Sequence, residues 1–354
     1  MSAVTGRDAA RPQNPPARPQ SPPARPQSPP ARSWTVLELL RWTQGHFASR
    51  GIETARLDAE CLLAAALGCD RLRLYLDFDK PVEASERGRF RELVRRRADE
   101  RVPVALLTGR REFWSLPFEV TPDVLVPRPE TETLVDWLLG RVPDREAELR
   151  ILDLGTGSGA IAVALASELP KARVTATDAS PAALAVAERN ALANGVADRV
   201  AFLVGDAFAP VAGQRFDLVA SNPPYVALRD EERLPPELRH EPRAALFAGP
   251  DGTDLLRRLA ADVGEHLVPG GFAAFEVGEE QASRVADWLR AAGLRDVGVV
   301  RDAGARPRVV TARAAGPEPL DAAAGADGQG RLDAADGAEA RDRRTGGGPD
   351  GGTS

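Results

Sequence analysis

The sequence predicts an α/β protein, in which a mostly parallel β-sheet covered by helices on both faces follows a small N-terminal helical domain. From Arg150 onward, short apolar runs of strand length alternate with helical patterns, which is typical of parallel sheets. Polar motifs follow several of these runs directly, and ligands of such sheets bind at the carboxyl ends of the strands. Between Ser33 and about residue 106, apolar residues recur at helical spacing, which predicts the helical domain.

Two tails of biased composition flank this globular part. Residues 1–32 contain 9 of the 30 Pro and repeat PPARPQS, whereas residues 315–354 contain 10 of the 32 Gly. Such segments have no apolar face to bury, so we predict that both are disordered. The chain between them divides into a helical domain over 33–106, a β-hairpin linker over 107–127 and a sheet domain over 128–314.

Charge and hydropathy exclude several classes of protein. Residues 1–32 carry five Arg and one Asp, and residues 315–354 carry four Arg and eight acidic residues, so the tails cancel and the globular part keeps the net charge of −6. This charge argues against a protein that grips long nucleic acid by electrostatics alone. The sequence shows no signal-peptide pattern and no apolar run of the roughly 20 residues that cross a bilayer. We expect a soluble, cytoplasmic monomer without stable binding to nucleic acid or membranes.

Three helices are predicted in the helical domain. Six apolar residues cluster between Trp34 and Trp42, and helical patterns follow over Ala55–Leu67 and Glu86–Arg97. The run Arg95-Arg96-Arg97 is interpreted as a solvated helix face, with an RNA-binding patch as the alternative. Cys61 and Cys69 have no His nearby, which favours buried, reduced thiols, and no metal site is expected.

The linker and the sheet domain follow in a regular order. Residues 111–126 alternate apolar and polar positions, which predicts a strand pair, and a helix over Thr131–Leu139 should come next. We then expect, in order, strand 150–154, helix Ala160–Leu169, strand Arg173–Thr177, a helix from Ser180 to Gly195, strands Val200–Val204 and Phe216–Ala220, helix Thr253–Leu267, a Gly270-Gly271 turn, strand Phe272–Val277, helix Glu279–Ala292 and two final strands.

A glycine-rich loop and an aspartate indicate a nucleotide-like ligand. Gly155, Gly157 and Gly159 separate the first strand of the sheet from its helix and let the backbone approach a ligand closely. Asp178 closes the next strand, where its carboxylate can accept hydrogen bonds from both hydroxyls of a ribose. The pair fits either a dinucleotide or an adenosyl compound. Asp206, which follows the third strand, would contact the adenine or remain a surface carboxylate.

The tetrapeptide Asn222-Pro223-Pro224-Tyr225 narrows the chemistry. Two prolines remove two backbone donors and stiffen the turn, so neighbouring carbonyls point outward as acceptors. The Asn222 side-chain oxygen and the Pro223 carbonyl could together accept both N–H bonds of a planar NH2 group. A nicotinamide oxidoreductase would explain the glycine loop and Asp178 but has no evident use for this turn.

These motifs resemble the class I S-adenosylmethionine-dependent methyltransferases that alkylate amide or exocyclic amino nitrogens, which have a Rossmann-like sheet. The segments VPRPETE (126–132), ILDLGTGSG (151–159), SNPPY (221–225) and EPRAALFAGPDG (241–252) resemble, more narrowly, the peptide chain release factor N5-glutamine methyltransferases, the PrmC/HemK family. The resemblance extends from about residue 34 to residue 313.

The resemblance implies roles for individual residues. The loop would surround the methionine part of S-adenosyl-L-methionine, Asp178 would bind its ribose, and Asp206 with Ala207 would lie along its adenine. Ala207 and Leu106 stand where relatives often have aromatic residues. Stacking on adenine is therefore expected to be weaker or to come from Phe208, and the interdomain contact at Leu106 is left open. The implied cofactor-binding residues are Gly155, Thr156, Gly157, Ser158, Gly159, Asp178, Asp206, Ala207 and Asn222; the substrate-binding residues are Asn222, Pro223, Pro224 and Tyr225, of which Asn222, Pro223 and Tyr225 are catalytic.

The function implied by the resemblance is methylation of the glutamine amide in the Gly-Gly-Gln motif of peptide chain release factors. Asn222 and Pro223 would hold the amide, and Tyr225 would pack against the glutamine side chain. No histidine base is needed, because the proton can leave after transfer, and His240 and His266 are interpreted as surface or helix residues. Three alternatives remain open: an adenine-N6 methyltransferase of DNA or RNA, an oxidoreductase, and an inactive adaptor on a methyltransferase fold.

Overall fold

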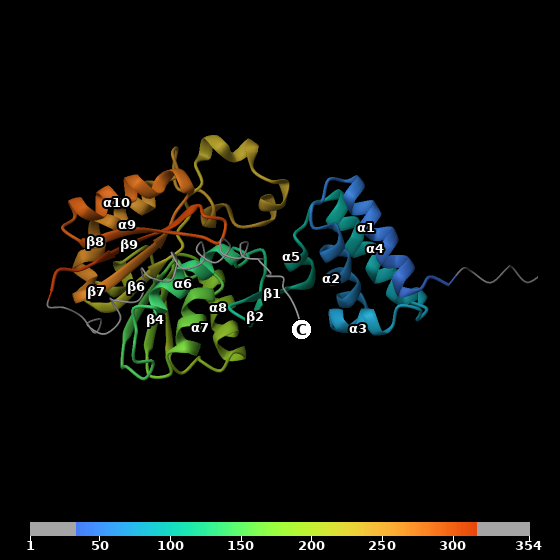
Figure 1. Ribbon diagram of the computed structural model, residues 1–354, viewed down its shortest axis with the longest axis horizontal. Coiled ribbons are helices and arrows are strands. Elements are labelled where there is room, and N and C mark those ends of the chain that lie inside the picture. The colour runs from blue at the N-terminus through green and yellow to red at the C-terminus, as the bar shows by residue number, and fades with distance from the viewer. Residues whose placement is uncertain (1–32, 317–354) are drawn as a thin grey trace, which may run out of the picture.

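The structure is a computed structural model that describes residues 33–316. The Pro-rich tail over 1–32 and nearly all of the tail over 315–354 lie outside the described residues. Figure 1 shows a bundle of helices on the right and a sheet covered by helices on the left, with α5 and the β1–β2 hairpin between them. No helix of the described part combines the length and the apolar character that a membrane span requires.

The helical domain contains the three predicted helices and two short ones that were not predicted. They are α1 (Val36–Ser49), α2 (Ala55–Leu67), α3 (Arg71–Leu76), α4 (Ala84–Asp99) and α5 (Val104–Thr108). Phe47, Leu62 and Phe90 belong to the core that α1, α2 and α4 share. The predicted cluster near Trp34 is wrong at Trp42, which is 53% exposed and stacks on His46. Cys61 and Cys69 are free and partly buried.

Arg97 corrects the interpretation of the arginine run as a solvated face. Arg95 and Arg96 are exposed enough to pair with acidic residues of their own helix end. Arg97, by contrast, is buried and reaches Asp58 on α2 at 2.7 Å. Its second partner, at 2.9 Å, is Glu237 in the sheet domain. Arg97 is therefore an ion-pair bridge between the two domains.

The linker is the predicted hairpin, and it is shorter than expected. β1 (Arg110–Phe113) and β2 (Leu116–Glu119) pair in antiparallel register, and the chain is no longer a strand from Val120 onward. Trp114 and Ser115 form the two-residue turn with φ values of 53° and 57°. Two successive positive φ angles are typical of the turns that match the twist of a hairpin.

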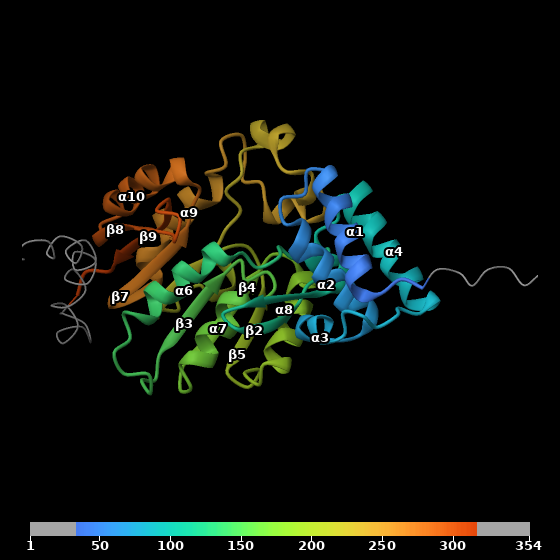
Figure 2. The ribbon, with the colours of Figure 1, turned by 45° about the vertical axis from the view of Figure 1, so that its right-hand side comes forward.

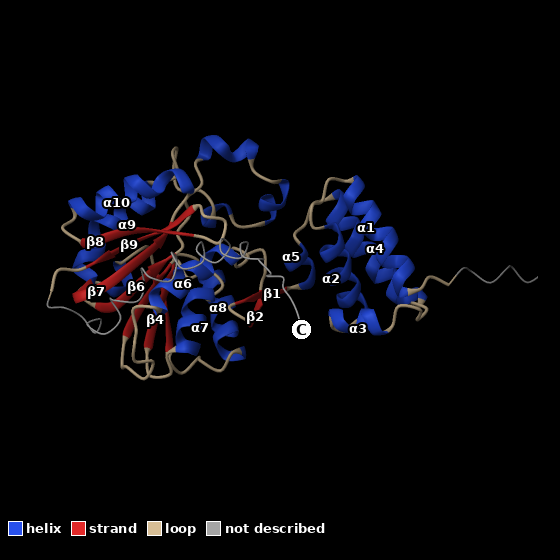
Figure 3. Cartoon of the chain, in the orientation of Figure 1, coloured by secondary structure: helices blue, strands red, loops and turns tan. Residues whose placement is uncertain are grey.

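The sheet has seven strands in the order β5-β4-β3-β6-β7-β9-β8, and the predicted α/β architecture is confirmed. The first five strands along the chain are parallel, and β9 is antiparallel to both of its neighbours. β3 lies between β4 and β6, so the strand order reverses there. The strands, red in Figure 3, are β3 (Arg150–Leu154), β4 (Arg173–Asp178), β5 (Val200–Val204), β6 (Phe216–Ser221), β7 (Leu267–Glu276), β8 (Arg295–Arg301) and β9 (Pro307–Arg313).

Helices cover both faces of the sheet, as predicted. Ile151 and Leu218 belong to the core under α6 and α7, whereas Leu152 and Val219 belong to the core under α9 and α10. Neighbouring residues of one strand thus reach opposite layers. The helices are α6 (Glu132–Leu139), α7 (Ala160–Glu168), α8 (Pro181–Ala193), α9 (Asp254–Asp262) and α10 (Ala282–Ala291). The 3-10 helices are η1 (Pro129–Thr131), η2 (Ala209–Val211), η3 (Leu228–Arg233), η4 (Pro236–His240), η5 (Arg243–Ala245), η6 (Val263–His266) and η7 (Glu279–Gln281).

Two expected boundaries after α9 are wrong. The predicted helix to Leu267 ends at Asp262 and tightens into η6. Gly270 and Gly271 do not form a turn between elements, because β7 already begins at Leu267 and runs through them. The pairing with β6 shifts in this stretch, from Phe216↔Leu267 to Leu218↔Phe272, and Gly270 has a φ of 83°. The glycines therefore lie in an irregular stretch of the pairing between β6 and β7.

Candidate active site

A cavity of about 430 Å³ opens where the strand order reverses, at the carboxyl ends of the parallel strands. Its size and position are those expected of a ligand site in an open α/β sheet. Most of the predicted site residues line it: Gly155, Thr156, Gly157, Ser158, Asp178, Asp206, Ala207, Asn222, Pro223 and Pro224. Gly159 and Tyr225 are not among the described residues that line it.

The glycine loop owes its shape to positive φ angles and to one close contact. Gly155, Gly157 and Gly159 have φ values of 68°, 57° and 82°. An added Cβ at Gly155 or Gly157 would meet no protein atom within 4 Å, whereas one at Gly159 would lie 3.1 Å from the Ala187 Cβ on α8. The first two glycines are thus needed for backbone conformation, and the third also for helix packing.

A buried carboxyl group, which the sequence analysis did not single out, lies under this loop. Asp153 at the end of β3 is fully buried, and its Oδ2 accepts hydrogen bonds from the Thr156 hydroxyl at 2.6 Å and the Ala162 N–H at 3.1 Å. Burial raises the pKa of Asp153 to about 7, although both hydrogen bonds oppose the rise. Asp153 ties the loop to the first turn of α7.

Asp178 at the end of β4 faces the same cavity. Its two carboxylate oxygens accept one hydrogen bond each, from the Gly157 N–H and the Ser180 N–H, both at 2.9 Å. The bonds fix the carboxylate against the glycine loop. Each oxygen of a carboxylate has capacity for a second hydrogen bond, so Asp178 can still accept from a ligand.

The Asn222-Pro223-Pro224 turn forms the opposite wall. Asn222 Nδ2 donates to the Thr131 hydroxyl at 3.0 Å, and Asn222 Oδ1 is buried without a hydrogen-bond partner among the described residues. The Ser221 hydroxyl holds the turn against the end of β3 through the Leu154 carbonyl at 2.7 Å. A buried acceptor without a partner costs about 1–3 kcal/mol, which a bound donor would relieve.

Two further acid groups lie behind this wall. The Thr131 hydroxyl donates to Glu276 Oε2 at 2.6 Å, and the Tyr225 hydroxyl lies 3.3 Å from Glu276 Oε1. Burial raises the pKa of Glu276 to about 7, while the Thr131 hydrogen bond and the Arg308 charge oppose the rise. Burial also raises the pKa of the Tyr225 hydroxyl, and the Glu276 charge adds to that effect.

Comparison with known proteins identifies the family. A PrmC N-terminal domain model matches residues 38–109, and a methyltransferase small domain model matches residues 131–249. A release factor glutamine methyltransferase of Geobacter sulfurreducens is 46% identical over 281 residues, which cover 79% of this chain and 97% of that protein. This chain belongs to the release factor glutamine methyltransferases.

A second relative has a similar degree of identity, and one solved structure matches part of this chain. A release factor glutamine methyltransferase of Xylella fastidiosa is 48% identical over 258 residues, covering 73% of this chain and 93% of that protein. The crystal structure of a release-factor-specific protein-(glutamine-N5) methyltransferase from Alicyclobacillus acidocaldarius is 32% identical and has a TM-score of 0.33. That match covers 57% of this chain and all of the solved chain.

The two sequence segments most specific to the release factor glutamine methyltransferases contact each other. Glu241, in the segment 241–252, is buried and accepts hydrogen bonds from the Val126 N–H at 3.0 Å and from Arg128 at 2.6 Å. Val126 and Arg128 belong to the segment 126–132, which carries Thr131 to the site. Glu241 thereby secures the approach of that segment to the cavity.

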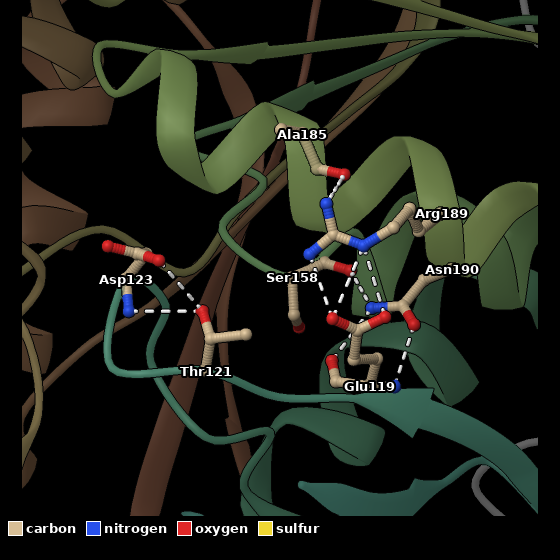
Figure 4. Close-up of polar contacts among 7 residues, drawn as sticks. All are labelled: Glu119, Thr121, Asp123, Ser158, Ala185, Arg189 and Asn190. Atoms are coloured by element: carbon tan, nitrogen blue, oxygen red, sulfur yellow. Dashed lines mark hydrogen bonds and ion pairs between the residues drawn. The ribbon is translucent and has the colours of Figure 1, made fainter.

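The hairpin linker is attached to the glycine loop through α8, as the close-up in Figure 4 shows. Asn190 is buried, and its Nδ2 donates to the carbonyls of Glu119 and Ser158 at 3.0 and 2.9 Å. Its Oδ1 accepts from the Glu119 N–H at 2.7 Å. Arg189 on the same helix pairs with the Glu119 carboxylate at 2.8 Å. Asn190 on α8 therefore connects the linker to the glycine loop.

The two departures from relatives of this family have different outcomes. Phe208 does not replace the missing aromatic at Ala207, because its ring is buried in the core and stacks on His266 at 4.3 Å. The expectation that Phe208 stacks on adenine is therefore wrong. His266, interpreted as a surface or helix residue, is buried and lies at the end of η6. Leu106 packs beside Val120, Val124 and Val186, so it contributes an apolar contact between the helical domain and α8.

Several residues at the site were missed by reasoning from the sequence. Thr131, Glu241 and Glu276 are buried polar residues, and each has a hydrogen-bond partner more than 90 residues away. Thr131 and Glu241 lay within the segments that carry the family resemblance, which was the available signal. Glu276 ends a strand as Asp178 does, and that position was a signal too. The predicted contact of Tyr225 with the substrate stays a prediction.

Proposed function

We propose that this chain transfers a methyl group from S-adenosyl-L-methionine to the side-chain amide nitrogen, N5, of the glutamine in the Gly-Gly-Gln motif of a peptide chain release factor. The unpartnered Asn222 Oδ1 in the cavity wall carries this proposal, because an amide N–H is the donor that it lacks. Membership of the release factor glutamine methyltransferases supports the choice of substrate.

The residues around the cavity fit the proposed cofactor. Bound S-adenosylmethionine supplies an electrophilic methyl group. The loop from Gly155 to Gly159 would surround its methionine part, and Asp178 would accept hydrogen bonds from its ribose. Asp206 and Ala207 would lie along the adenine, with the Asp206 carboxylate also within 2.6 Å of Arg258 at the surface. An exposed pair of this kind is weak enough to yield to a ligand.

The turn at Asn222 would position the substrate amide. An amide nitrogen is a poor nucleophile, because its lone pair is delocalised into the carbonyl. If Asn222 Oδ1 and the Pro223 carbonyl accept both N–H bonds, the amide is held in one orientation and its nitrogen lone pair is directed at the methyl group. Fixed acceptors of this kind lower the barrier by placement and electrostatic preorganisation. The proton can leave to solvent after transfer.

The two domains would have separate roles in methyl transfer and in binding of the release factor. In this proposal the sheet domain over 128–314 performs the transfer, and the helical domain over 33–106 docks the body of the release factor. The hairpin linker over 107–127 would hold the two in register. The contacts of Arg97 with Glu237 and of Leu106 with the α8 side support a fixed arrangement of the domains.

The proposal is tested by incubating the protein with cofactor and either a release factor or a Gly-Gly-Gln peptide, and locating the methyl group by mass spectrometry. We expect methyl on the glutamine, and at least a hundredfold lower turnover in Asn222→Ala, as for loss of one oriented catalytic group. Asn194→Ala, which removes an amide at the end of α8 outside the cavity, is the matched control and should keep its activity.

Assays with nucleic acid as the substrate distinguish the adenine-N6 methyltransferase alternative from the proposed glutamine methylation. The same turn could hold the amino group of a flipped adenine. Methyl incorporation into duplex or single-stranded DNA or RNA, with none into the peptide, would contradict the proposal and support that alternative. Methyl on a residue other than glutamine would contradict both.

A further inference from the structure

A continuous chain of hydrogen bonds leads from the cavity wall to a buried carboxylate. Asn222 Nδ2 donates to Thr131 Oγ1 at 3.0 Å, and the Thr131 hydroxyl donates to Glu276 Oε2 at 2.6 Å. The other carboxylate oxygen lies 3.3 Å from the Tyr225 hydroxyl. Thr131 and Glu276 are 4% and 1% exposed, so water does not compete for these bonds. The three segments involved are η1, the end of β7 and the Asn222 turn.

The direction of each bond follows from the number of protons available. An ionised carboxylate only accepts, and a hydroxyl has a single proton to donate. When Glu276 is ionised, the Thr131 hydroxyl donates its only hydrogen bond to the Glu276 carboxylate. Toward Asn222, the Thr131 oxygen then acts only as an acceptor. The side chain of Asn222 must then present its NH2 group to Thr131. Its Oδ1 is consequently directed away from Thr131 and has no hydrogen-bond partner within residues 33–316.

Protonation of Glu276 would remove this constraint. A protonated carboxyl group can donate to Thr131, whose own proton is then free to point at Asn222. The amide of Asn222 could rotate by half a turn, with Oδ1 toward Thr131 and NH2 toward the cavity. In that orientation Asn222 offers donors to a substrate that itself presents N–H groups.

We propose that Glu276 is a positioning residue which, as a carboxylate and through Thr131, holds the Asn222 amide with its oxygen toward the substrate. This inference rests on the proposed function, in which the substrate is an amide that donates its N–H groups to the Asn222 oxygen. It predicts that productive binding of the substrate amide requires an ionised Glu276, although Glu276 itself does not reach the cavity.

The charged surroundings of Glu276 favour ionisation only in part. Arg308 on β9 attracts the carboxylate, Glu130 on η1 repels it, and the Tyr225 hydroxyl stabilises it. Arg128, next to η1, is bound to Glu241. Because burial outweighs the favourable contacts, the pKa of Glu276 rises to about 7. Ionisation is then lost as the pH falls below about 7, within the range where activity can be measured.

The first test compares three variants at two buried threonines. Thr131→Val removes the hydroxyl at nearly constant shape, and we expect kcat to fall about tenfold or more, as for a lost orienting contact. Thr131→Ser keeps a hydroxyl and should recover most of the loss. Thr43→Val is the matched control, because Thr43 is buried on α1 with an unpartnered hydroxyl, and it should keep full activity. A Thr131→Val enzyme as active as the control would overturn the inference.

The second test follows pH. In the wild type, kcat on the peptide should rise as Glu276 ionises, between about pH 6 and pH 8, and Glu276→Gln should lose this rise. A wild-type profile that stays unchanged in Glu276→Gln would overturn the inference.

A third test needs no turnover, so it separates this inference from the proposed function. The side-chain NH2 resonances of Asn222, assigned by their loss in Asn222→Ala, should shift with a midpoint near pH 7 in the wild type and stay constant in Glu276→Gln. An enzyme that shows this titration but leaves the peptide unmethylated would contradict the proposed function alone. Resonances that do not titrate in the wild type would contradict the positioning role.

Discussion

Asp153 places an ionisable group where neither solvent nor a cation reaches it. Its Oδ2 is bound by Thr156 and Ala162, whereas its Oδ1 is buried without a partner among the described residues. Because burial favours the neutral form, the pKa of Asp153 rises to about 7 in the folded protein. The group therefore contributes most to stability below its ordinary pKa of about 4, and that contribution is lost as the pH rises through about 7.

Asp153→Asn should remove this pH dependence. The variant keeps an oxygen for Thr156 and Ala162 but cannot ionise, so its free energy of unfolding should improve relative to the wild type as the pH rises from about 4 to about 7. Denaturant unfolding at several pH values in this range measures the difference. Asp198→Asn, at an exposed aspartate before β5, is the matched control and should differ little from the wild type throughout. A constant difference for Asp153→Asn would contradict the assignment.

Residues that act through a local motif could be predicted from the sequence, and residues that act through a distant partner could not. The three glycines and Asp178 could be recognised in the sequence. A glycine that permits a positive φ and a carboxylate that ends a strand are both identified by residue type and position. Thr131 could not be recognised in this way, because its role depends on a hydrogen bond to Glu276, 145 residues away. Phe208 was misjudged for the same reason, because only the tertiary structure shows that its ring stacks on His266.

Among the elements, the turn at 222–225 depends on the segment that ends at Gly252. Val226 donates to the Leu246 carbonyl at 2.8 Å, and Ala248 donates back to the Val226 carbonyl at 3.1 Å. Gln281 fixes the Tyr225 and Gly252 carbonyls with one amide group, at 2.9 and 3.2 Å. Gly252 has a φ of 75°, and a Cβ there would lie 2.8 Å from the Ala227 nitrogen and still closer to the Tyr225 carbonyl oxygen.

Gly252→Ala should displace the turn. The loss of activity should therefore be larger than the loss caused by an unfavourable backbone conformation alone. A left-handed φ costs a residue with a Cβ about 1–2 kcal/mol, and the clash with the Tyr225 carbonyl adds to this. Gly195→Ala is the matched control, because Gly195 has a φ of 70° and open space around it. Thermal unfolding and peptide methylation should both show a larger loss for Gly252→Ala. Equal losses in the two variants would show that the contact with the turn is unimportant.

Long elements with a clear apolar pattern were predicted well. β5 and α2 have the predicted bounds, since β5 is an apolar run of strand length and α2 ends at Gly68 in the left-handed conformation. The short helices α3 and α5 were missed because they bury one residue and none, respectively, and so leave no periodic signal. The pair Gly270-Gly271 has the composition of a turn, but it lies inside β7, between Leu267 and Phe272, which both pair with β6.

For the whole molecule, the decisive contact between domains is made by a segment of the sheet domain that extends over the helical domain. Figures 1 and 2 both show the stretch with η3 and η4 rising from the sheet toward the helices. There Glu237 pairs with Arg97 and Arg101, and His240 lies 2.8 Å from the Glu100 carbonyl. Burial acts to raise the pKa of Glu237, but its hydrogen bonds, above all that from Arg97, and the charges of Arg97 and Arg101 together outweigh burial, so the pKa is lowered.

Glu237→Gln should therefore weaken the arrangement of the domains without touching the cavity. We expect kcat/KM for the intact release factor to fall roughly three- to tenfold, which corresponds to about 1 kcal/mol. Turnover of a short Gly-Gly-Gln peptide, which we expect to depend less on the helical domain, should stay close to that of the wild type. Glu232→Gln, at an exposed position in η3, is the matched control. An equal loss on protein and peptide would contradict a docking role for the helical domain.

The position of β9 has a consequence for the folding of the chain during its synthesis. The last strand of the described chain is not at an edge but lies between β7 and β8, and it pairs with both. A nascent chain that has been synthesised only as far as residue 301 would contain β7 and β8 with no strand to join them. The exposed border of β7 then offers unpaired backbone groups to other chains. The sheet can close only when residues 307–313 arrive, so premature stops just before them should yield aggregates rather than shortened enzymes.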